Sequence, residues 1–470
     1  MDRSGAPAAS AARNARADHV ARAVRAFRPV SVRVDGDGRA DGGKRADGGR
    51  ADGGRVDGGR VDGGGPVPAA AFRWDVAGDP RDPLAVALRH ASRRDAEPAV
   101  AVVLGPAHRS GDSAVLLEGI ARAGASGGRR LVLLHRGAGG GSLLRSAALE
   151  SPGLRVAVLE LPVRDSGPGL PARIARLARG AAPGAELRVA GDGTVTRTGW
   201  RAVTLPEPPV PPDSPARPGG AALITGGLGG LGLRAAAVLS AVRGYRPVLL
   251  DTTAPGELPP RPAALLSRLC DAPPGADVLT ADVTDHRAVA RVLGRVPLPV
   301  RAVVHCAGVV AGGPVAGARA RDLDALAAPK ADGLGTVLDV LDNGALRHLV
   351  VFGSVTARVA HRQLGGYGLA NELLRREALR RAAALPRCAT VVAEWSLWSG
   401  AGRAHEMGAV GQARRMGMAP VPLAPGMAAL LRLLRWPAGA RAAGAVVLTG
   451  PGEDSTFPPE GPDECGNSPT

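Results

Sequence analysis

The sequence predicts an α/β protein made of two successive doubly wound units, in which helices cover both faces of a mostly parallel sheet. Short apolar runs alternate with stretches of helical periodicity along most of the 470 residues, as strand–helix–strand crossovers require. A proline-dense segment, 205–219, divides this series in two. Just after it, an apolar run stops at Thr225 and is followed by a glycine-rich turn and a helix-forming stretch.

The first 65 residues are expected to form a disordered, low-complexity extension. A pentad of Arg, Ala or Val, Asp, Gly and Gly recurs there, and it offers too little apolar surface to offset the chain entropy lost on folding. Within this extension, Ala17 to Phe27 could form one short amphipathic docking helix. The last segment, 451–470, is rich in Pro, Gly, Asp and Glu, which predicts a disordered tail.

Residues 66–204 are predicted to form a truncated Rossmann-like subdomain. The expected strands are Val100–Leu104, Arg130–Leu134 and Leu154–Leu161, and the expected helices are Leu84–Arg93, Ala114–Ala123, Ser142–Leu149 and Leu170–Leu177. A hairpin that turns at Gly191-Asp192-Gly193 closes the unit. Because no glycine fingerprint opens this unit, we do not expect it to bind a nucleotide.

Residues 220–450 are predicted to form a complete second unit with the catalytic role. The glycine-rich turn leads into a helix over Leu233–Val242, and the later strands are expected at Pro247–Asp251, Asp277–Leu279, Ala302–His305, Leu349–Phe352, Thr390–Trp395 and Ala445–Leu448. In a parallel sheet of this kind, ligands bind outside the carboxyl ends of the strands.

Composition excludes several other classes of function. The net charge is +16, but only two of the 59 basic residues are lysines, Lys44 and Lys330, so the charge reflects a chain-wide bias toward arginine. Aromatic residues make up 2% of the chain, too few for base stacking, and nucleic-acid binding is not expected. The four cysteines show no C-x-x-C spacing, so neither disulfides nor a metal site is expected. No apolar run is long enough for a membrane span, and a cytoplasmic location is the expectation.

The turn at the start of the second unit is the candidate cofactor site. A glycine backbone can adopt positive φ and lie close to a pyrophosphate, whose charge then meets the free N–H groups of the helix start. The candidate residues in this turn are Thr225, Gly226, Gly227, Leu228, Gly229, Gly230, Leu231 and Gly232.

Four polar residues farther along the chain carry the candidate chemistry. Ser354 closes an expected strand, and Tyr367 and Asn371 share one face of an expected helix because they are four residues apart. Lys330 is the one lysine in a predicted folded domain of a chain that otherwise uses arginine, which indicates a role that only a compact ammonium group can fill.

With these residues in this order, the second unit resembles the ketoreductase domain of modular polyketide synthases, a branch of the short-chain dehydrogenase/reductase superfamily. In that branch the lysine precedes the serine and the asparagine follows the tyrosine by four residues, as do Lys330, Ser354, Tyr367 and Asn371. The first unit resembles the structural subdomain of the same family, including the Ser-Leu-Leu-Arg stretch at Ser142. Together the two resemblances cover about Phe72 to Thr449.

The resemblance implies a role for each of these residues. Tyr367 would donate a proton to the forming alkoxide, Ser354 would hydrogen-bond the substrate carbonyl, and Lys330 would lower the pKa of the tyrosine. Asn371 would orient Lys330 or a water molecule. The nicotinamide cofactor would lie on the glycine turn, with Asp282 and Val283 near its adenine and Ala307 and Gly308 beside its ribose.

The cofactor implied by the family is NADPH, but one position departs from the family pattern. The family's Ser-Arg after the second strand, where the arginine contacts the 2′-phosphate, is replaced by Asp251-Thr252. A carboxylate at this position accepts hydrogen bonds from a free ribose 2′-hydroxyl and repels a phosphate, which makes NADH a serious alternative.

The resemblance predicts a ketoreductase that reduces the β-keto group of a thioester on an acyl carrier protein. It would act in trans or dock on a polyketide synthase subunit through the N-terminal extension, and its arginines suit an acidic carrier. Two alternatives stay open: a dehydrogenase of the same superfamily that uses NAD on a free small alcohol or ketone, and a non-catalytic scaffold domain of a synthase complex.

Overall fold

The computed structural model describes residues 24–34, 72–125, 130–164, 167, 169–207, 219–408, 410–415, 418–439, 442–451 and 457. Most of the predicted extension, of the proline-dense linker and of the predicted tail lies outside these ranges. Within them, no helix combines the length and apolarity needed to cross a bilayer.

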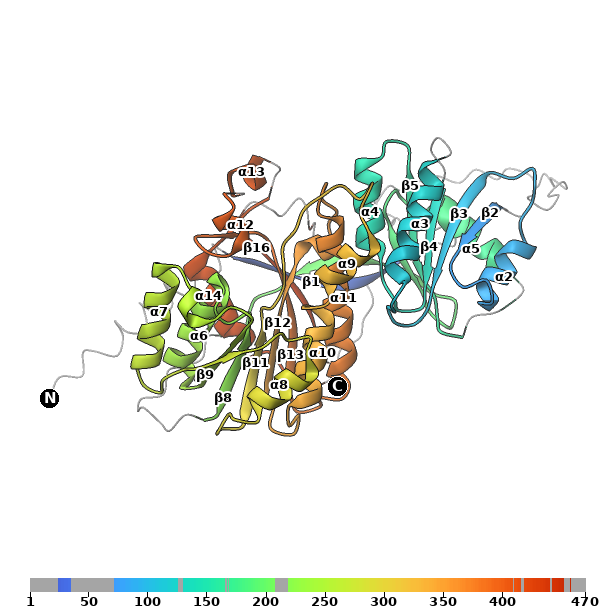
Figure 1. Cartoon of the computed structure of the whole chain (residues 1–470). Helices are drawn as coiled ribbons and strands as arrows, with labels where there is room; N and C mark the ends of the chain where they lie inside the picture. Colours follow the sequence, from blue (N-terminus) through green and yellow to red (C-terminus); the bar gives the residue numbers. More distant parts are fainter. Residues whose placement is uncertain are drawn as a thin grey trace, which may run out of the picture.

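The two predicted units share one continuous sheet (Figure 1). In the described part of the chain this sheet has 14 strands in the order β10-β9-β8-β11-β12-β13-β16-β1-β7-β6-β5-β4-β3-β2. Strands β10 to β16 in this order pair in parallel and form the C-terminal unit, and β2 to β6 pair in parallel in the N-terminal unit. The predicted α/β fold class with two doubly wound units is therefore confirmed.

The C-terminal unit is a sheet between two layers of helices. Its strands are β8 (Ala221–Thr225), β9 (Arg246–Asp251), β10 (Asp277–Thr280), β11 (Val300–His305), β12 (His348–Ser354), β13 (Ala389–Trp395) and β16 (Gly444–Thr449). One face is covered by α6 (Gly230–Arg243), α7 (Pro260–Asp271) and α14 (Leu423–Leu433), and the other by α8 (His286–Leu293), α10 (Ala331–Val340) and α11 (Gly365–Ala382). The remaining elements are α9 (Ala320–Ala327), the short helices η1 (Pro255–Glu257), η2 (Val355–Ala357), α12 (Arg403–Glu406) and α13 (Val410–Arg415), and the pair β14 (Trp398–Ser399) and β15 (Val421–Pro422).

The N-terminal unit repeats this arrangement in shorter form. Its strands are β2 (Arg73–Ala77), β3 (Pro98–Leu104), β4 (Arg130–His135), β5 (Arg155–Glu160), β6 (Glu186–Val189) and β7 (Val195–Ala202). Helices α2 (Pro83–His90) and α5 (Leu170–Gly180) cover one face, and α3 (Asp112–Gly124) and α4 (Gly141–Glu150) cover the other. The hairpin predicted around Asp192 joins β6 to the antiparallel β7.

A strand from the predicted disordered extension joins the two halves, which corrects that prediction. Residues Arg25–Arg33 form β1, which pairs antiparallel with β16 on one side and with β7 on the other. The helix predicted for Ala17 to Phe27 is therefore wrong over Arg25 to Phe27, where the chain is extended. The apolar side chain of Phe27 is only 1% exposed, and its burial in the sheet favours the strand over local helical periodicity.

One residue of the predicted disordered tail is also packed in the core. Phe457 is fully buried and stacks on Phe27, with ring centroids 5.7 Å apart. Its ring also meets Trp200 of β7 edge-on at 4.9 Å. The tail prediction is therefore wrong at this position, because an aromatic side chain among polar neighbours can still anchor a segment by burial.

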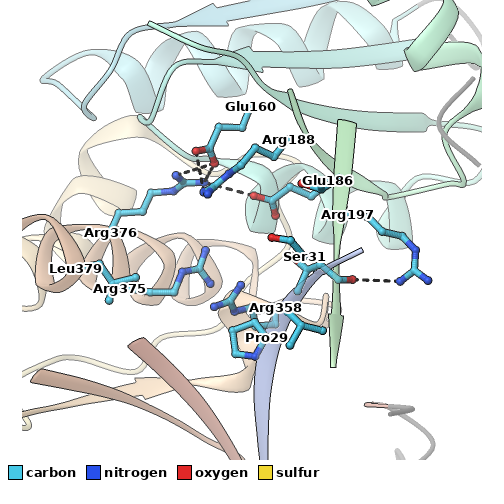
Figure 2. Close-up of a pocket in the computed structure, with 13 residues that line it drawn as sticks. Pro29, Ser31, Glu160, Glu186, Arg188, Arg197, Arg358, Arg375, Arg376 and Leu379 are labelled. Carbon is cyan, nitrogen blue, oxygen red and sulfur yellow. Dashed lines mark hydrogen bonds and ion pairs between the residues drawn. The ribbon is translucent and has the colours of Figure 1, made fainter. Parts of the chain in front are cut away.

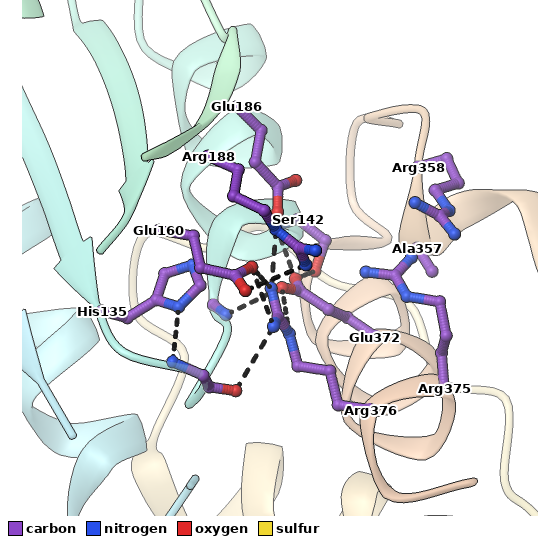
Figure 3. A network of polar contacts seen from close by, with 12 residues as sticks. His135, Ser142, Glu160, Glu186, Arg188, Ala357, Arg358, Glu372, Arg375 and Arg376 are labelled. Carbon is purple, nitrogen blue, oxygen red and sulfur yellow. Dashed lines mark hydrogen bonds and ion pairs between the residues drawn. The ribbon is translucent and has the colours of Figure 1, made fainter. Parts of the chain in front are cut away.

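A buried polar network fixes α11 against the N-terminal unit (Figure 3). The Glu372 carboxylate of α11 accepts hydrogen bonds from the backbone N–H groups of Gly140 (3.1 Å) and Ser142 (2.9 Å) and from the Ser142 hydroxyl (2.7 Å), at the start of α4. Burial alone would raise the pKa of Glu372, but the charge of Arg376 reverses this effect and brings the pKa to about 2. Because α11 also carries Tyr367 and Asn371, this network helps to position the candidate site.

Candidate functional site

The predicted site residues gather at the carboxyl edge of the C-terminal sheet. Thr225 ends β8, Asp251 ends β9 and Ser354 ends β12. Four other candidates lie just beyond strand ends: Asp282 and Val283 follow β10, and Ala307 and Gly308 follow β11. The remaining three lie at helix starts: Lys330 precedes α10, and Tyr367 and Asn371 lie in the first two turns of α11. Parallel pairing brings these sequence-distant positions to one edge.

The glycine turn has the tight backbone packing that such a turn requires. Gly226 has φ +62°, and a Cβ there would approach the backbone of Cys306 and Ala307 at 3.0 Å. A Cβ on Gly232 would lie 2.2 Å from the Gly226 carbonyl oxygen, and one on Gly227 would lie 2.7 Å from the carbonyl oxygen of Ile224. The turn is thus pressed against itself and against the end of β11.

The start of α6 suits an anionic ligand. Its N-cap, Gly229, makes no side-chain capping hydrogen bond, and no acidic residue lies in the first turn. The first N–H groups of the helix are therefore not satisfied by a cap, and their partial positive charge favours an anion. Leu228 and Leu231 serve mainly as packing residues, because Leu228 is 3% exposed and Leu231 packs on the same core.

A short hydrogen-bond chain connects the glycine turn to Lys330. The buried Thr225 hydroxyl accepts from the Ala307 N–H (3.3 Å) and lies 2.8 Å from His305 Nδ1. On its other side, His305 Nε2 lies 2.9 Å from the Lys330 carbonyl oxygen, so Nε2 donates and Nδ1 accepts. Burial, and then the charge of Lys330, lowers the pKa of His305 to about 3, which keeps the imidazole neutral.

Lys330 lies in a narrow space beside Tyr367. Its Nζ atom is 5.6 Å from the centre of the Tyr367 ring, and the side chain is 5% exposed. A Cβ on Gly308 would come within 2.7 Å of Lys330 Cε, so glycine at 308 makes room for the lysine. Burial lowers the pKa of Lys330 to about 8, which leaves the ammonium mostly charged at neutral pH.

Tyr367, Ser354 and Asn371 form the polar group next to this lysine. Burial raises the pKa of Tyr367, while hydrogen bonding with Asn371 and Ser354 opposes that rise, so the phenol keeps its proton at neutral pH. Ser354 Oγ also accepts a 3.3 Å hydrogen bond from the Thr356 N–H. Asn371 donates from Nδ2 to the Tyr367 carbonyl oxygen at 2.8 Å, and its buried Oδ1 has no partner among the described residues.

Asp251 is fixed by the glycine turn. Its carboxylate accepts hydrogen bonds from the N–H groups of Leu228 (2.9 Å) and Thr253 (3.1 Å), and Thr252 is exposed beside it. Each carboxylate oxygen keeps a lone pair for a further donor.

The two candidates beyond β10 differ in exposure. The exposed Asp282 carboxylate accepts hydrogen bonds from the N–H and hydroxyl groups of Thr284. The Val283 side chain is buried in the core at 5% exposure, so that only the backbone of Val283 is available to a ligand.

The segment after β13 covers the glycine turn. A Cβ on Gly230 would lie 2.9 Å from Glu406 Oε1 and 3.0 Å from the Gly402 nitrogen. Trp395 and Trp398 pack on Phe352 with ring centroids 5.5 and 6.3 Å from it, and both are buried, which makes them core residues of this region. Helices α12 and α13 lie above this edge of the sheet (Figure 1).

Sequence reasoning missed the contributions of His305 and Glu406. His305 ends an apolar strand, and a histidine at such a position must find buried hydrogen-bond partners, which is the sequence signal for its role. The proximity of Glu406 to the glycine turn depends on how the segment folds back, and no local pattern indicates it.

Comparison with known proteins finds relatives of this chain. Residues 220–400 match the sequence model of the KR domain. Erythronolide synthase EryA2 of Saccharopolyspora erythraea is 32% identical over 212 residues, which cover 44% of this chain and 6% of that protein. Pikromycin polyketide synthase component PikAIII of Streptomyces venezuelae is 31% identical over 263 residues, 55% of this chain and 16% of that protein. The chain thus spans only a small part of each of these relatives.

Solved structures show the same two-unit architecture over nearly the whole chain. The ketoreductase from the first module of phoslactomycin biosynthesis in Streptomyces sp. HK803 has a TM-score of 0.66 at 24% identity and covers 92% of this chain and 95% of its own. A structure of A-type ketoreductases from a modular polyketide synthase has a TM-score of 0.68 at 21% identity and covers 93% of this chain and 95% of its own.

The match to the KR domain spans the parallel sheet up to β13, the glycine turn and the group of Lys330, Ser354, Tyr367 and Asn371. Residues 220–400 thus match the KR domain, the relatives found are polyketide synthases, and the solved ketoreductase structures share the fold, in agreement with the sequence resemblance.

Proposed function

We propose that this chain reduces the β-keto group of an acyl thioester to a β-hydroxyl group, with a nicotinamide cofactor as hydride donor. The observation that carries the proposal is the buried Lys330 ammonium beside the phenol of Tyr367, with Ser354 and Asn371 as polar neighbours. Scaffolding would require none of these four side chains in one place.

The residues support proton transfer at the carbonyl oxygen. Tyr367, whose phenol stays protonated at neutral pH, donates its proton to the oxygen that gains charge as hydride is added at carbon. Ser354 donates a hydrogen bond to the same oxygen, and the Lys330 charge stabilises the phenolate that Tyr367 becomes. Asn371 Oδ1, which has no hydrogen-bond partner among the described residues, is available to accept from Lys330 or from a water molecule that restores the proton.

The glycine turn fits the pyrophosphate of a dinucleotide. The helix start at Gly229 and Gly230 lacks a side-chain cap, and Gly226 brings the turn against Cys306 and Ala307. The ribose would lie beside Ala307 and Gly308. When bound, the cofactor supplies the hydride.

We further propose that NADH is preferred over NADPH, although the family resemblance implies NADPH. Asp251 is held by two backbone N–H groups at the end of β9, where its carboxylate would accept hydrogen bonds from a ribose 2′-hydroxyl. A 2′-phosphate at that position would meet like charge. Asp251→Ser should therefore raise the affinity for NADPH relative to NADH by about tenfold or more, and an unchanged preference would contradict this role.

An acyl carrier protein is the proposed source of the thioester. Helix α13 above the site presents Arg414 and Arg415 to solvent, and Arg362 is exposed near the start of α11. Exposed guanidinium groups at this edge would suit an acidic carrier. Docking through the N-terminal extension concerns residues mostly outside the described ranges and stays a prediction.

The test is turnover of a β-ketoacyl thioester with each cofactor, in wild type and Tyr367→Phe. We expect the variant to bind cofactor normally and to lose most of its turnover, because the phenol supplies the proton. The matched control is Tyr245→Phe, which changes the other tyrosine of the chain, a core residue next to α6. Turnover of free ketones but not of thioesters would favour the dehydrogenase alternative, and absence of binding by either cofactor would favour the scaffold.

A further inference from the structure

A second concave site lies where β1 and β7 meet α11, away from the glycine turn (Figure 2). Its volume is about 220 Å³. Five arginines but only two glutamates are among the described residues that line it: Arg188, Arg197, Arg358, Arg375 and Arg376 with Glu160 and Glu186. The lining therefore carries an excess of positive charge.

The excess is concentrated at two arginines that share one carboxylate. Arg358 Nε lies 2.9 and 3.2 Å from the two oxygens of Glu394, and Arg375 Nη1 lies 3.1 Å from Glu394 Oε1. Glu394 is fully buried, and the Arg358 and Arg375 side chains are 14% and 6% exposed. Figure 2 shows the two guanidinium groups turned toward one another at the cavity.

Most hydrogen-bond donors of this pair are unused within the described part of the chain. Among the described residues, Arg358 Nη1 and Nη2 and Arg375 Nε and Nη2 have no hydrogen-bond partner. Burial, and then the charge of Arg375, lowers the pKa of Arg358, as expected for two like charges held together. A buried charge without a counter-ion is costly, so the pair lacks one negative charge.

The neighbouring carboxylates are paired with other arginines, although the charge of Glu186 also acts on Arg358 and Arg375. Glu160 is paired with Arg376 (3.2 Å) and Arg188 (2.9 Å), and Glu186 is paired with Arg145 (3.0 Å) and Arg376 (3.4 Å). Each glutamate thus already serves two arginines.

A cation site in the same network is disfavoured. Ligand atoms of His135, Glu160 and Glu186 lie within 4.8 Å of one another. However, His135 Nδ1 accepts a hydrogen bond from the Gly137 N–H at 3.2 Å, so the neutral ring carries its proton on Nε2 and has no lone pair there for a metal. The surrounding guanidinium groups would also repel a cation.

We propose that this cavity is a binding site for a small oxyanion, a phosphate or a carboxylate, held by the Arg358 and Arg375 guanidinium groups. Planar guanidinium groups match the oxygens of both anions by forming paired, charge-assisted hydrogen bonds. An anion here would neutralise the pair and stabilise the seam between β1 and α11.

The test is calorimetric titration of the full chain with inorganic phosphate, and separately with acetate, at constant ionic strength. We expect saturable binding of one anion per chain, weakened about tenfold to a hundredfold in Arg375→Gln. The matched control is Arg380→Gln, which removes a 60% exposed arginine of the same helix and should leave binding unchanged. The relative affinities of phosphate and acetate distinguish the two kinds of oxyanion.

A second variant, Glu394→Gln, should strengthen anion binding instead of weakening it. Glu394→Gln removes the shared carboxylate and leaves two charges to be neutralised, so it should bind phosphate more tightly and gain more thermal stability from it than wild type. This variant also tests the site if Arg375→Gln does not fold. No saturable binding by wild type, or equal binding by wild type and Arg375→Gln, would overturn the proposal, because any bound anion would then lie elsewhere.

Discussion

Replacing Gly232 by alanine should lower the stability of the protein, because a Cβ at this position would clash with the backbone of the glycine turn. A Cβ at this position would lie 2.2 Å from the Gly226 carbonyl oxygen and 2.9 Å from Gly227 Cα. Normal contact distances require the backbone to move by about 1 Å, and overpacking of this kind costs about 1–3 kcal/mol. The displaced atoms belong to the turn that would hold the pyrophosphate, so cofactor affinity should fall as well.

Gly229→Ala is the matched control in the same turn. Gly229 has φ −68° and ψ 163°, which any residue can adopt, and a Cβ there would meet one atom, the Gly226 carbonyl oxygen, at 3.2 Å. Its stability in the absence of cofactor should stay within about 1 kcal/mol of wild type. Urea unfolding and cofactor titration of both variants measure the difference. A Gly232→Ala variant as stable as wild type, with unchanged cofactor affinity, would refute the described packing.

Three further changes test other parts of the site. Burial lowers the pKa of Lys330 to about 8 from 10.5, so the rate of reduction should fall above about pH 8, which a pH–rate profile measures. The free energy of unfolding of the free protein should rise between pH 8 and 10.5, because the unfolded chain binds more protons in that range. Unfolding curves at several pH values check this second effect. Glu372→Gln should lower the free energy of unfolding by about 3–5 kcal/mol, because it removes the carboxylate that accepts from the start of α4 and one of the three carboxylates paired with Arg376. In wild type this contribution is lost as pH falls from 4.5 toward 2, and urea titrations at several pH values measure it. Glu406→Gln should tighten cofactor binding about two- to fivefold by removing a negative charge beside the start of α6, and equal affinity in a titration would contradict that effect.

Local patterns predicted most strands of each unit, although β2 (Arg73–Ala77) was not among the expected strands. Apolar runs such as 100–104 and 302–305 lie inside observed strands, because strands buried on both faces need continuous apolar sequence. The positions of Thr225, Asp251 and Ser354 at one edge then follow from parallel pairing.

Features that depend on distant partners could not be predicted in this way. The segment of β1 has an arginine-rich sequence that also suits an amphipathic helix, and only its pairing with β7 and β16 makes it a strand. Likewise, Glu394 and Arg375 lie in separate elements, and their sharing of charge with Arg358 emerges only when β13, α11 and η2 pack together. Long-range electrostatic pairing leaves no periodic signal in the sequence.

The most direct test of the proposed chemistry is transfer of an isotopic label from the cofactor. Reduced nicotinamide cofactor deuterated at C4 would be incubated with a β-ketoacyl thioester and the enzyme, and the product examined by mass spectrometry and NMR. We predict one deuterium on the new carbinol carbon with wild type, and a large loss of labelled product with Tyr367→Phe at saturating cofactor. Labelled product formed equally fast by Tyr367→Phe, or no labelled product from wild type that binds both ligands, would contradict the role assigned to the Tyr367 and Lys330 pair.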